Sequence, residues 1–96
     1  MPLKFRHLTI SPEVLSQTVA NEAVLLDLKT EKYFGLNTVG LRVWELLQEN
    51  GDTQIVLEKM LKEFEVAPDV LESDLNDLLA RLHAAGLVQE SASAPA

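Results

Sequence analysis

The pattern of hydrophobic and polar positions is most regular between residues 24 and 47, where its period changes from two to that of a helix. From Val24 to Lys29 alternate positions are apolar, which is typical of a half-buried strand. Residues 29–32 are polar and predict a turn, and residues 33–36 predict the returning strand. Asn37 can accept a backbone N–H from a first helical turn, and apolar residues follow at helical spacing as far as Leu47. The stretch predicts a β-hairpin that leads directly into an amphipathic helix.

Weaker signals on both sides complete the predicted elements. Residues 4–10 and 14–19 predict short strands, and the first helix is expected to end at residues 49–51, with Gly51 in the left-handed conformation of a C-terminal cap. A second helix is predicted from Asp52 or Thr53, and a third from Pro68 to Gly86, before Leu87 and Val88 return to the core. Residues 1–90 therefore predict a single α+β domain, an antiparallel sheet followed by three helices, and residues 91–96 a disordered tail. The second helix carries the apolar residues Val56, Leu57, Met60, Leu61 and Phe64. The leucine stripe of the third helix and Trp44 are interpreted as core; the stripe is Leu71, Leu75, Leu78, Leu79 and Leu82.

Composition limits the function more than the fold. A chain of 96 residues that is 47% apolar can form one modest core. It has no cysteine, no apolar run long enough for a bilayer and no signal-peptide h-region, which together favour a cytoplasmic protein without a membrane partner. Fifteen acidic and eight basic residues give a net charge of −7, which disfavours binding to nucleic acid.

No arrangement of residues indicates catalysis, a metal or a cofactor. His7 and His83 lie on different predicted elements and have no matched carboxylate spacing. Gly35 and Gly40 are too isolated for a phosphate-binding loop, and no nucleophile-elbow motif is present. The sequence predicts a protein that is not an enzyme.

The charges of the third helix and of the hairpin suggest a binding cleft. Six acidic residues and no basic one lie between Glu63 and Asp77, whereas the hairpin turn carries Lys29 and Lys32 with Glu31 as its only acid. If the third helix lies beside the second hairpin strand, the cleft between them has an acidic wall and a more basic end. An ordinary solvated helix face explains the same acids equally well.

Three segments carry a resemblance to a known family. Residues 26–40 (LDLKTEKYFGLNTVG), 43–47 (VWELL) and 78–88 (LLARLHAAGLV) resemble the PqqD-like family and its relatives, the RiPP recognition elements, which bind leader segments of ribosomally made, post-translationally modified peptides. The similarity extends from Phe5 to Val88 and is greatest to the stand-alone leader-binding proteins of lasso-peptide biosynthesis. One departure is Glu31, where relatives often have glycine in the hairpin turn. A left-handed backbone at this position would cost a glutamate on the order of 1 kcal/mol, so the resemblance does not fix the type of turn.

The resemblance implies a winged-helix-like fold, with a three-stranded antiparallel β-sheet and three α-helices, in which a leader peptide adds as a further strand to the sheet edge. It implies that the edge is Lys32, Tyr33, Phe34, Gly35 and Leu36, and that the facing wall of the third helix includes Leu71, Asp74, Leu75, Leu78 and Arg81. Gly35 would let a peptide backbone approach closely, or would simply kink the strand. Phe34→Asp or Leu75→Asp is expected to abolish peptide binding and to leave the fold intact.

The implied function is a non-catalytic adaptor that captures the leader of a precursor peptide and presents it to a leader peptidase and a macrocyclase. It implies no cofactor, no nucleic acid and a monomer in the absence of partners. A winged-helix DNA-binding module is the alternative, although Arg81 is the third helix's basic residue among many acids. A structural subunit that pairs edge to edge with a second copy is a further alternative.

Overall fold

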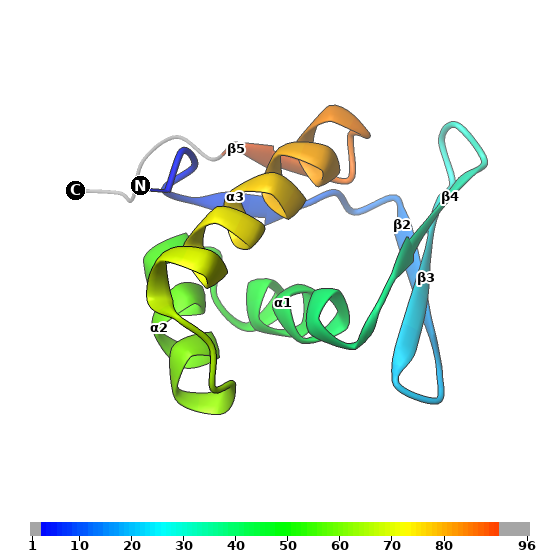
Figure 1. Cartoon of the computed structure of the whole chain (residues 1–96). Helices are drawn as coiled ribbons and strands as arrows, with labels where there is room; N and C mark the ends of the chain where they lie inside the picture. Colours follow the sequence, from blue (N-terminus) through cyan, green and yellow to red (C-terminus); the bar gives the residue numbers. More distant parts are fainter. Residues whose placement is uncertain (1–2, 91–96) are drawn as a thin grey trace.

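The computed structural model describes residues 3–90, which form two small antiparallel sheets and three helices (Figure 1). The predicted tail at residues 91–96 lies outside the described residues. No helix in the described part of the chain is both long and apolar enough to cross a membrane. The elements are β1 (Leu8–Ile10), β2 (Val14–Val19), β3 (Glu22–Asp27), β4 (Lys32–Leu36), α1 (Thr38–Glu49), α2 (Thr53–Glu63), α3 (Pro68–Ala84) and β5 (Val88–Glu90).

The larger sheet has the order β2-β3-β4, and it stands at one side of the molecule with α2 at the opposite side (Figure 1). The pairs Leu25↔Phe34 and Ala23↔Leu36 fix the register between β3 and β4. Ala23, Leu25 and Leu36 are buried against the helices, whereas the alternate residues of these strands face the other side. This confirms the predicted α+β class, a three-stranded antiparallel sheet with three helices.

A second sheet, formed by β1 and β5, is an element that the sequence pattern does not predict. Ile10 pairs with Val88 and Leu8 with Glu90, so the two ends of the described chain lie side by side. The N-terminal strand is shorter than the predicted range 4–10, because the backbone carbonyls of Phe5 and Arg6 instead accept hydrogen bonds from Thr53 at the start of α2. These contacts fasten the N-terminal segment to the helices.

The joint between β4 and α1 is built as predicted. The side-chain oxygen of Asn37 accepts the backbone N–H of Gly40 at 2.8 Å, which caps the helix. Trp44 lies in the core, as predicted, and so does Met60. Among residues 3–90 no hydrogen-bond partner is found for the Trp44 indole Nε1.

The predicted role of Gly51 is wrong. The helix ends at Asn50 in an extended conformation, and Gly86 after α3 is the described glycine with a positive φ, 77°. Gly51 is instead a place of close approach, because a Cβ there would lie 2.4 Å from the carbonyl oxygen of Leu8. The absence of a side chain, rather than backbone freedom, is what this position requires.

α1 and α2 are also joined on the surface. The Arg42 guanidinium donates to both carboxylate oxygens of Glu63, at 2.7 and 2.8 Å, and to Glu45 at 3.3 Å. The hydrogen bonds from Arg42 hold the pKa of the Glu63 carboxyl below its usual range. Both side chains are about one-third exposed, so solvent screens the pair and its contribution to stability is small.

The turn between β3 and β4 explains how Glu31 is tolerated. Glu31 has φ 61°, a left-handed conformation that favours glycine over a residue with a side chain. The buried carboxylate of Asp27 accepts the backbone N–H of Lys29 at 2.9 Å and the hydroxyl of Thr30 at 3.1 Å, and the Glu31 N–H donates to the Asp27 carbonyl at 2.6 Å. These bonds fix the turn and offset the cost at Glu31.

Candidate binding groove beside the edge strand

Strand β4 pairs with β3 along one edge, and no strand among residues 3–90 pairs with its other edge. The free edge runs from Lys32 to Leu36, as expected from the sequence. An unpaired edge presents backbone N–H and C=O groups to any chain that can lie against it. The fold must therefore either blunt this edge or use it.

A groove adjoins the edge strand where β4 passes into α1, and α3, which lies above α1 in Figure 1, forms its other wall. Its volume is about 440 Å³, within the range of roughly 300–1,000 Å³ that is common for ligand pockets. Polar and apolar side chains from three elements line it together. The residues are Gly35, Leu36, Asn37, Val39, Gly40, Asp74, Asp77, Leu78 and Arg81.

The wall from α3 is a single row of side chains. Asp74, Leu78 and Arg81 follow one another at spacings of four and three residues, and Asp77 is three residues after Asp74 and four before Arg81, so all of them project from one side of the helix. Leu78 is half-buried and packs against the core, whereas the other three are exposed. The groove therefore has an apolar centre at Leu78 and charged groups on both sides of it along α3.

Arg81 is held next to the edge strand by an aromatic contact. Its guanidinium carbon lies 5.6 Å from the centre of the Phe34 ring, within the range of cation–π attraction. No residue between 3 and 90 accepts a hydrogen bond from the Arg81 guanidinium, so its N–H groups can donate to a ligand. Arg81 thus places hydrogen-bond donors beside the exposed edge of β4.

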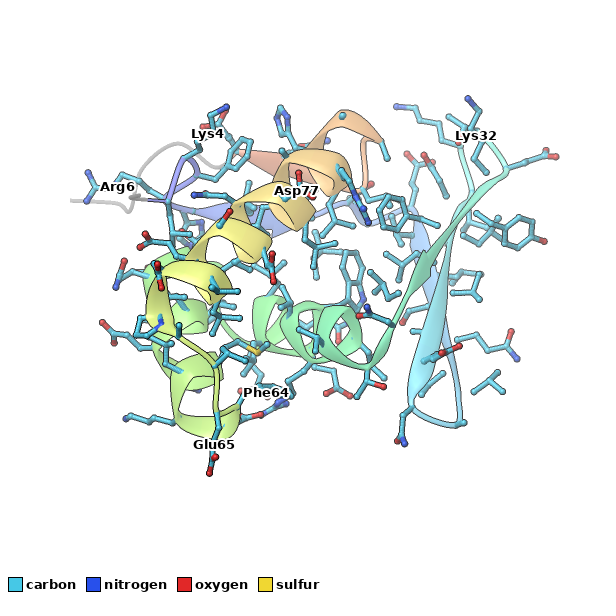
Figure 2. All side chains as sticks on the ribbon, in the orientation of Figure 1. Lys4, Arg6, Lys32, Phe64, Glu65 and Asp77 are labelled. Atoms are coloured by element: carbon cyan, nitrogen blue, oxygen red, sulfur yellow. The ribbon has the colours of Figure 1, made fainter. Side chains whose placement is uncertain are left out.

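The structure brings five of the predicted site residues together in the groove: Gly35, Leu36, Asp74, Leu78 and Arg81. Phe34 adjoins them through Arg81. Lys32 and Tyr33 belong to the free edge and are exposed, but they do not line the groove. Figure 2 shows Lys32 well away from Asp77 on α3.

Leu71 and Leu75 occupy the core behind the wall instead. Leu75 is only 2% exposed and Leu71 5%, so they support α3 from inside and present no surface to a ligand. Periodicity cannot separate them from Leu78, because all three are leucines at helical spacing. The burial of Leu75 also argues against the expectation that Leu75→Asp leaves the fold intact.

Sequence reasoning misses the groove residues from the first turn of α1, namely Asn37, Val39 and Gly40. Asn37 is recognisable from the sequence only as a helix cap. Val39 offers a signal, because an apolar residue in the first turn is a candidate for exposure, and it is 40% exposed. Where that turn lies relative to α3 depends on the fold.

Nothing in the described part of the fold requires a glycine at position 35. A Cβ at this position would meet no atom within 4 Å, and its φ is not positive, so neither crowding nor backbone strain requires glycine. It lines the groove and also a neighbouring hollow of about 480 Å³ on the outer face of the sheet, with Leu36 and Asn37 shared between the two.

The outer face of the sheet is apolar and uncovered by any described element. By the strand register, Leu15, Val19, Val24 and Tyr33 share this face, and Val19 is 64% exposed. A contiguous exposed apolar face is uncommon on a monomeric protein and marks a surface for interaction. This face begins at Gly35, where the groove ends.

Comparison with known proteins places the fold in a family. The family described as coenzyme PQQ synthesis protein D (PqqD) matches residues 22–88, which include the hairpin, all three helices and the groove. No curated protein sequence matches the chain.

Two solved structures are similar to the chain over most of its length. The first, TbiB1 in complex with the TbiA(beta) leader peptide, is 37% identical with a TM-score of 0.80, and the match covers 88% of this chain and 98% of that one. The second, lasso peptide synthetase B1 complexed with the leader peptide, is 27% identical with a TM-score of 0.71, covering 86% and 98%. The chain belongs to the PqqD family and is a PqqD-like RiPP recognition element.

Proposed function

We propose that this protein is a non-catalytic adaptor that binds the leader segment of a ribosomally made precursor peptide, in a pathway of the lasso-peptide type. The observation that carries the proposal is the free edge of β4 beside the groove under α3, in a fold that is similar to two solved leader-peptide complexes. Among residues 3–90 no three histidine, cysteine, aspartate or glutamate side chains are grouped to hold a metal ion.

The mode of binding is β-augmentation. An extended peptide on the free edge of β4 would form main-chain hydrogen bonds, which give affinity regardless of sequence. Alternate side chains of that peptide would enter the groove over Leu36, Val39 and Leu78, and these give specificity. Because α3 forms the far wall, the groove limits the width of the chain that can lie along the edge.

Backbone methylation tests this mode directly. We expect a fluorescein-labelled TbiA(beta) leader peptide, or the leader of this protein's own precursor, to bind in an anisotropy titration. N-methylation of successive peptide amides should weaken binding at every second position of the docked segment, because alternate N–H groups face β4. Each lost bond should weaken binding roughly 5- to 150-fold, corresponding to about 1–3 kcal/mol for an unsatisfied partner.

The intervening positions of the same scan are the internal control, since their N–H groups point away from β4. A flat scan would show that the peptide does not bind as a strand. Absence of binding by both leaders would contradict the proposed function.

The groove offers little to nucleic acid. The α3 row that faces it carries two carboxylates, Asp74 and Asp77, against the single guanidinium of Arg81. The chain's net charge of −7 adds long-range repulsion of phosphate. No observation in the structure favours the DNA-binding alternative.

We also propose that the bound peptide is presented to a leader peptidase and then to a macrocyclase, and that the adaptor alone is a monomer. The apolar outer face supports contact with the peptidase, because it is continuous with the groove at Gly35. We expect Leu15→Glu with Val19→Glu to leave leader binding unchanged and to abolish co-elution with the pathway's peptidase in size-exclusion chromatography with light scattering. Unchanged co-elution would exclude this face, and a dimer of the adaptor alone would contradict the monomer.

A further inference from the structure

The charged side chains on the groove face of α3 are separated by sign. Asp74 and Asp77 lie towards the N-terminal end of the row, and Arg81 lies at its C-terminal end, over Phe34. With a rise of about 1.5 Å per residue, Arg81 is roughly 6 Å from Asp77 and roughly 10 Å from Asp74 along the helix axis. An extended chain covers these distances in about two to three residues.

These charges have no ionic partner within the described chain. Neither carboxylate, nor Arg81, forms an ion pair with any residue between 3 and 90, and Arg81 has only its ring contact with Phe34. Elsewhere on the surface, Arg42 is paired with Glu45 and Glu63. The groove thus keeps three charges available that the fold itself does not use.

The nearby N-terminus of α1 does not cancel the negative end. Gly40 and Val39 of the first helical turn line the groove, and a helix N-terminus carries about half a positive charge. Two ionised carboxylates outweigh it by about fourfold in charge. The field at this end of the groove therefore favours a cation.

We propose that the groove selects peptides by the order of their charges, with a lysine or arginine against Asp74 and Asp77 and an aspartate or glutamate against Arg81. The two peptide residues are separated by two to three positions of extended chain. This proposal rests on the proposed function, and it names the chemical pattern of the peptide that the site takes. The apolar contact at Leu78 lies between the two charged contacts.

A selection from a random-peptide display library on the immobilised protein tests the pattern whatever the sequence of the natural precursor. We expect the enriched peptides to share a basic and an acidic residue at the stated spacing. Selection on Asp74→Asn with Asp77→Asn should lose the basic preference and retain the acidic one, and Arg81→Gln should do the reverse.

The matched control is Glu65→Gln with Asp69→Asn, which changes the net charge equally at residues that do not line the groove. Figure 2 shows Glu65 at the far end of the molecule from Asp77. This variant should enrich the same peptides as the natural protein.

Titration of one enriched peptide and its Lys→Gln variant should show about a two- to fivefold loss of affinity, as for an exposed ion pair, and no loss on the Asp74→Asn, Asp77→Asn protein. The difference should shrink at high ionic strength. Enrichment without a charge pattern would overturn the inference and leave the proposed function standing. Failure to enrich any peptide would instead count against the proposed function itself.

Discussion

Gly35→Val is expected to make the protein more stable and to weaken peptide binding at least tenfold. The position gains stability because a β-branched residue suits a strand better than glycine by about 1 kcal/mol. The fold accepts the side chain, since a Cβ at Gly35 meets no atom within 4 Å. Peptide binding is weakened because Gly35 lines the groove, and the new methyl groups take up space on the outer face beside the free edge, where the side chains of a docked peptide would lie.

The two effects are measured separately. Thermal unfolding by circular dichroism should shift upwards by roughly 4–8 °C for a domain of this size, and anisotropy with the labelled leader should report the weaker affinity. Gln17→Val is the matched control, because Gln17 lies on the same face of the sheet but on the opposite edge strand, β2. It should leave peptide binding unchanged. Undiminished binding by Gly35→Val would mean that the peptide does not approach this part of the edge.

The hairpin and the helix that follows it are predictable because their signals are local. The alternation from Val24 onwards predicts a strand, but it points to the wrong buried face, because Val24 and Leu28 are exposed whereas Leu25 and Asp27 are buried. Asn37 specifies the start of α1 within a few residues. The short strand β5 is not predictable, since its three residues become a strand only by pairing with β1 at the other end of the chain. The role of Gly51 escapes prediction for the same reason, because the carbonyl of Leu8 that crowds it comes from a distant segment.

Glu31 shows how a local rule can be overruled. Intrinsic backbone preference argues against a left-handed glutamate, and the sequence offers no means to weigh this against the rest of the turn. The Asp27 carboxylate organises the turn through hydrogen bonds to Lys29 and Thr30, and the Glu31 N–H is also bonded to the Asp27 carbonyl. Several bonds of about 1 kcal/mol each outweigh one unfavourable dihedral of similar size.

The site is predictable as an edge and a facing helix, but not to the level of individual leucines. Leu71, Leu75 and Leu78 belong to one apolar face of the helix by their spacing. The core does not bury every residue of such a face. Leu75 lies at the centre of that face and is buried, whereas Leu78 lies at its margin and is shared between the core and the groove. Only the packing of α3 on its neighbours decides which leucine belongs to which surface.

Two aspartate substitutions, at Leu75 and at Leu78, test which leucine belongs to the core and which to the groove. Leu75→Asp should unfold the protein, because removing the buried leucine side chain costs about 2–5 kcal/mol and burying a carboxylate adds to this. The sum is comparable with the total stability of about 5–15 kcal/mol that is usual for a domain. Circular dichroism should show the loss of native structure, and any loss of peptide binding by this variant says nothing about the groove.

Leu78→Asp should behave differently although it is the same change three residues along α3. Its carboxylate can turn into the open groove and remain hydrated, so the variant should stay folded. A urea titration should show a free energy of unfolding that is lower by about 1–2 kcal/mol. Peptide binding should fall at least tenfold, because the apolar centre of the groove is replaced by a third negative charge beside Asp74 and Asp77. Leu78→Asn separates the two causes, since it removes the apolar contact without adding the charge. If both aspartate variants unfolded, Leu78 would belong to the core like Leu75, and the groove would lack the apolar contact that the proposed binding mode requires.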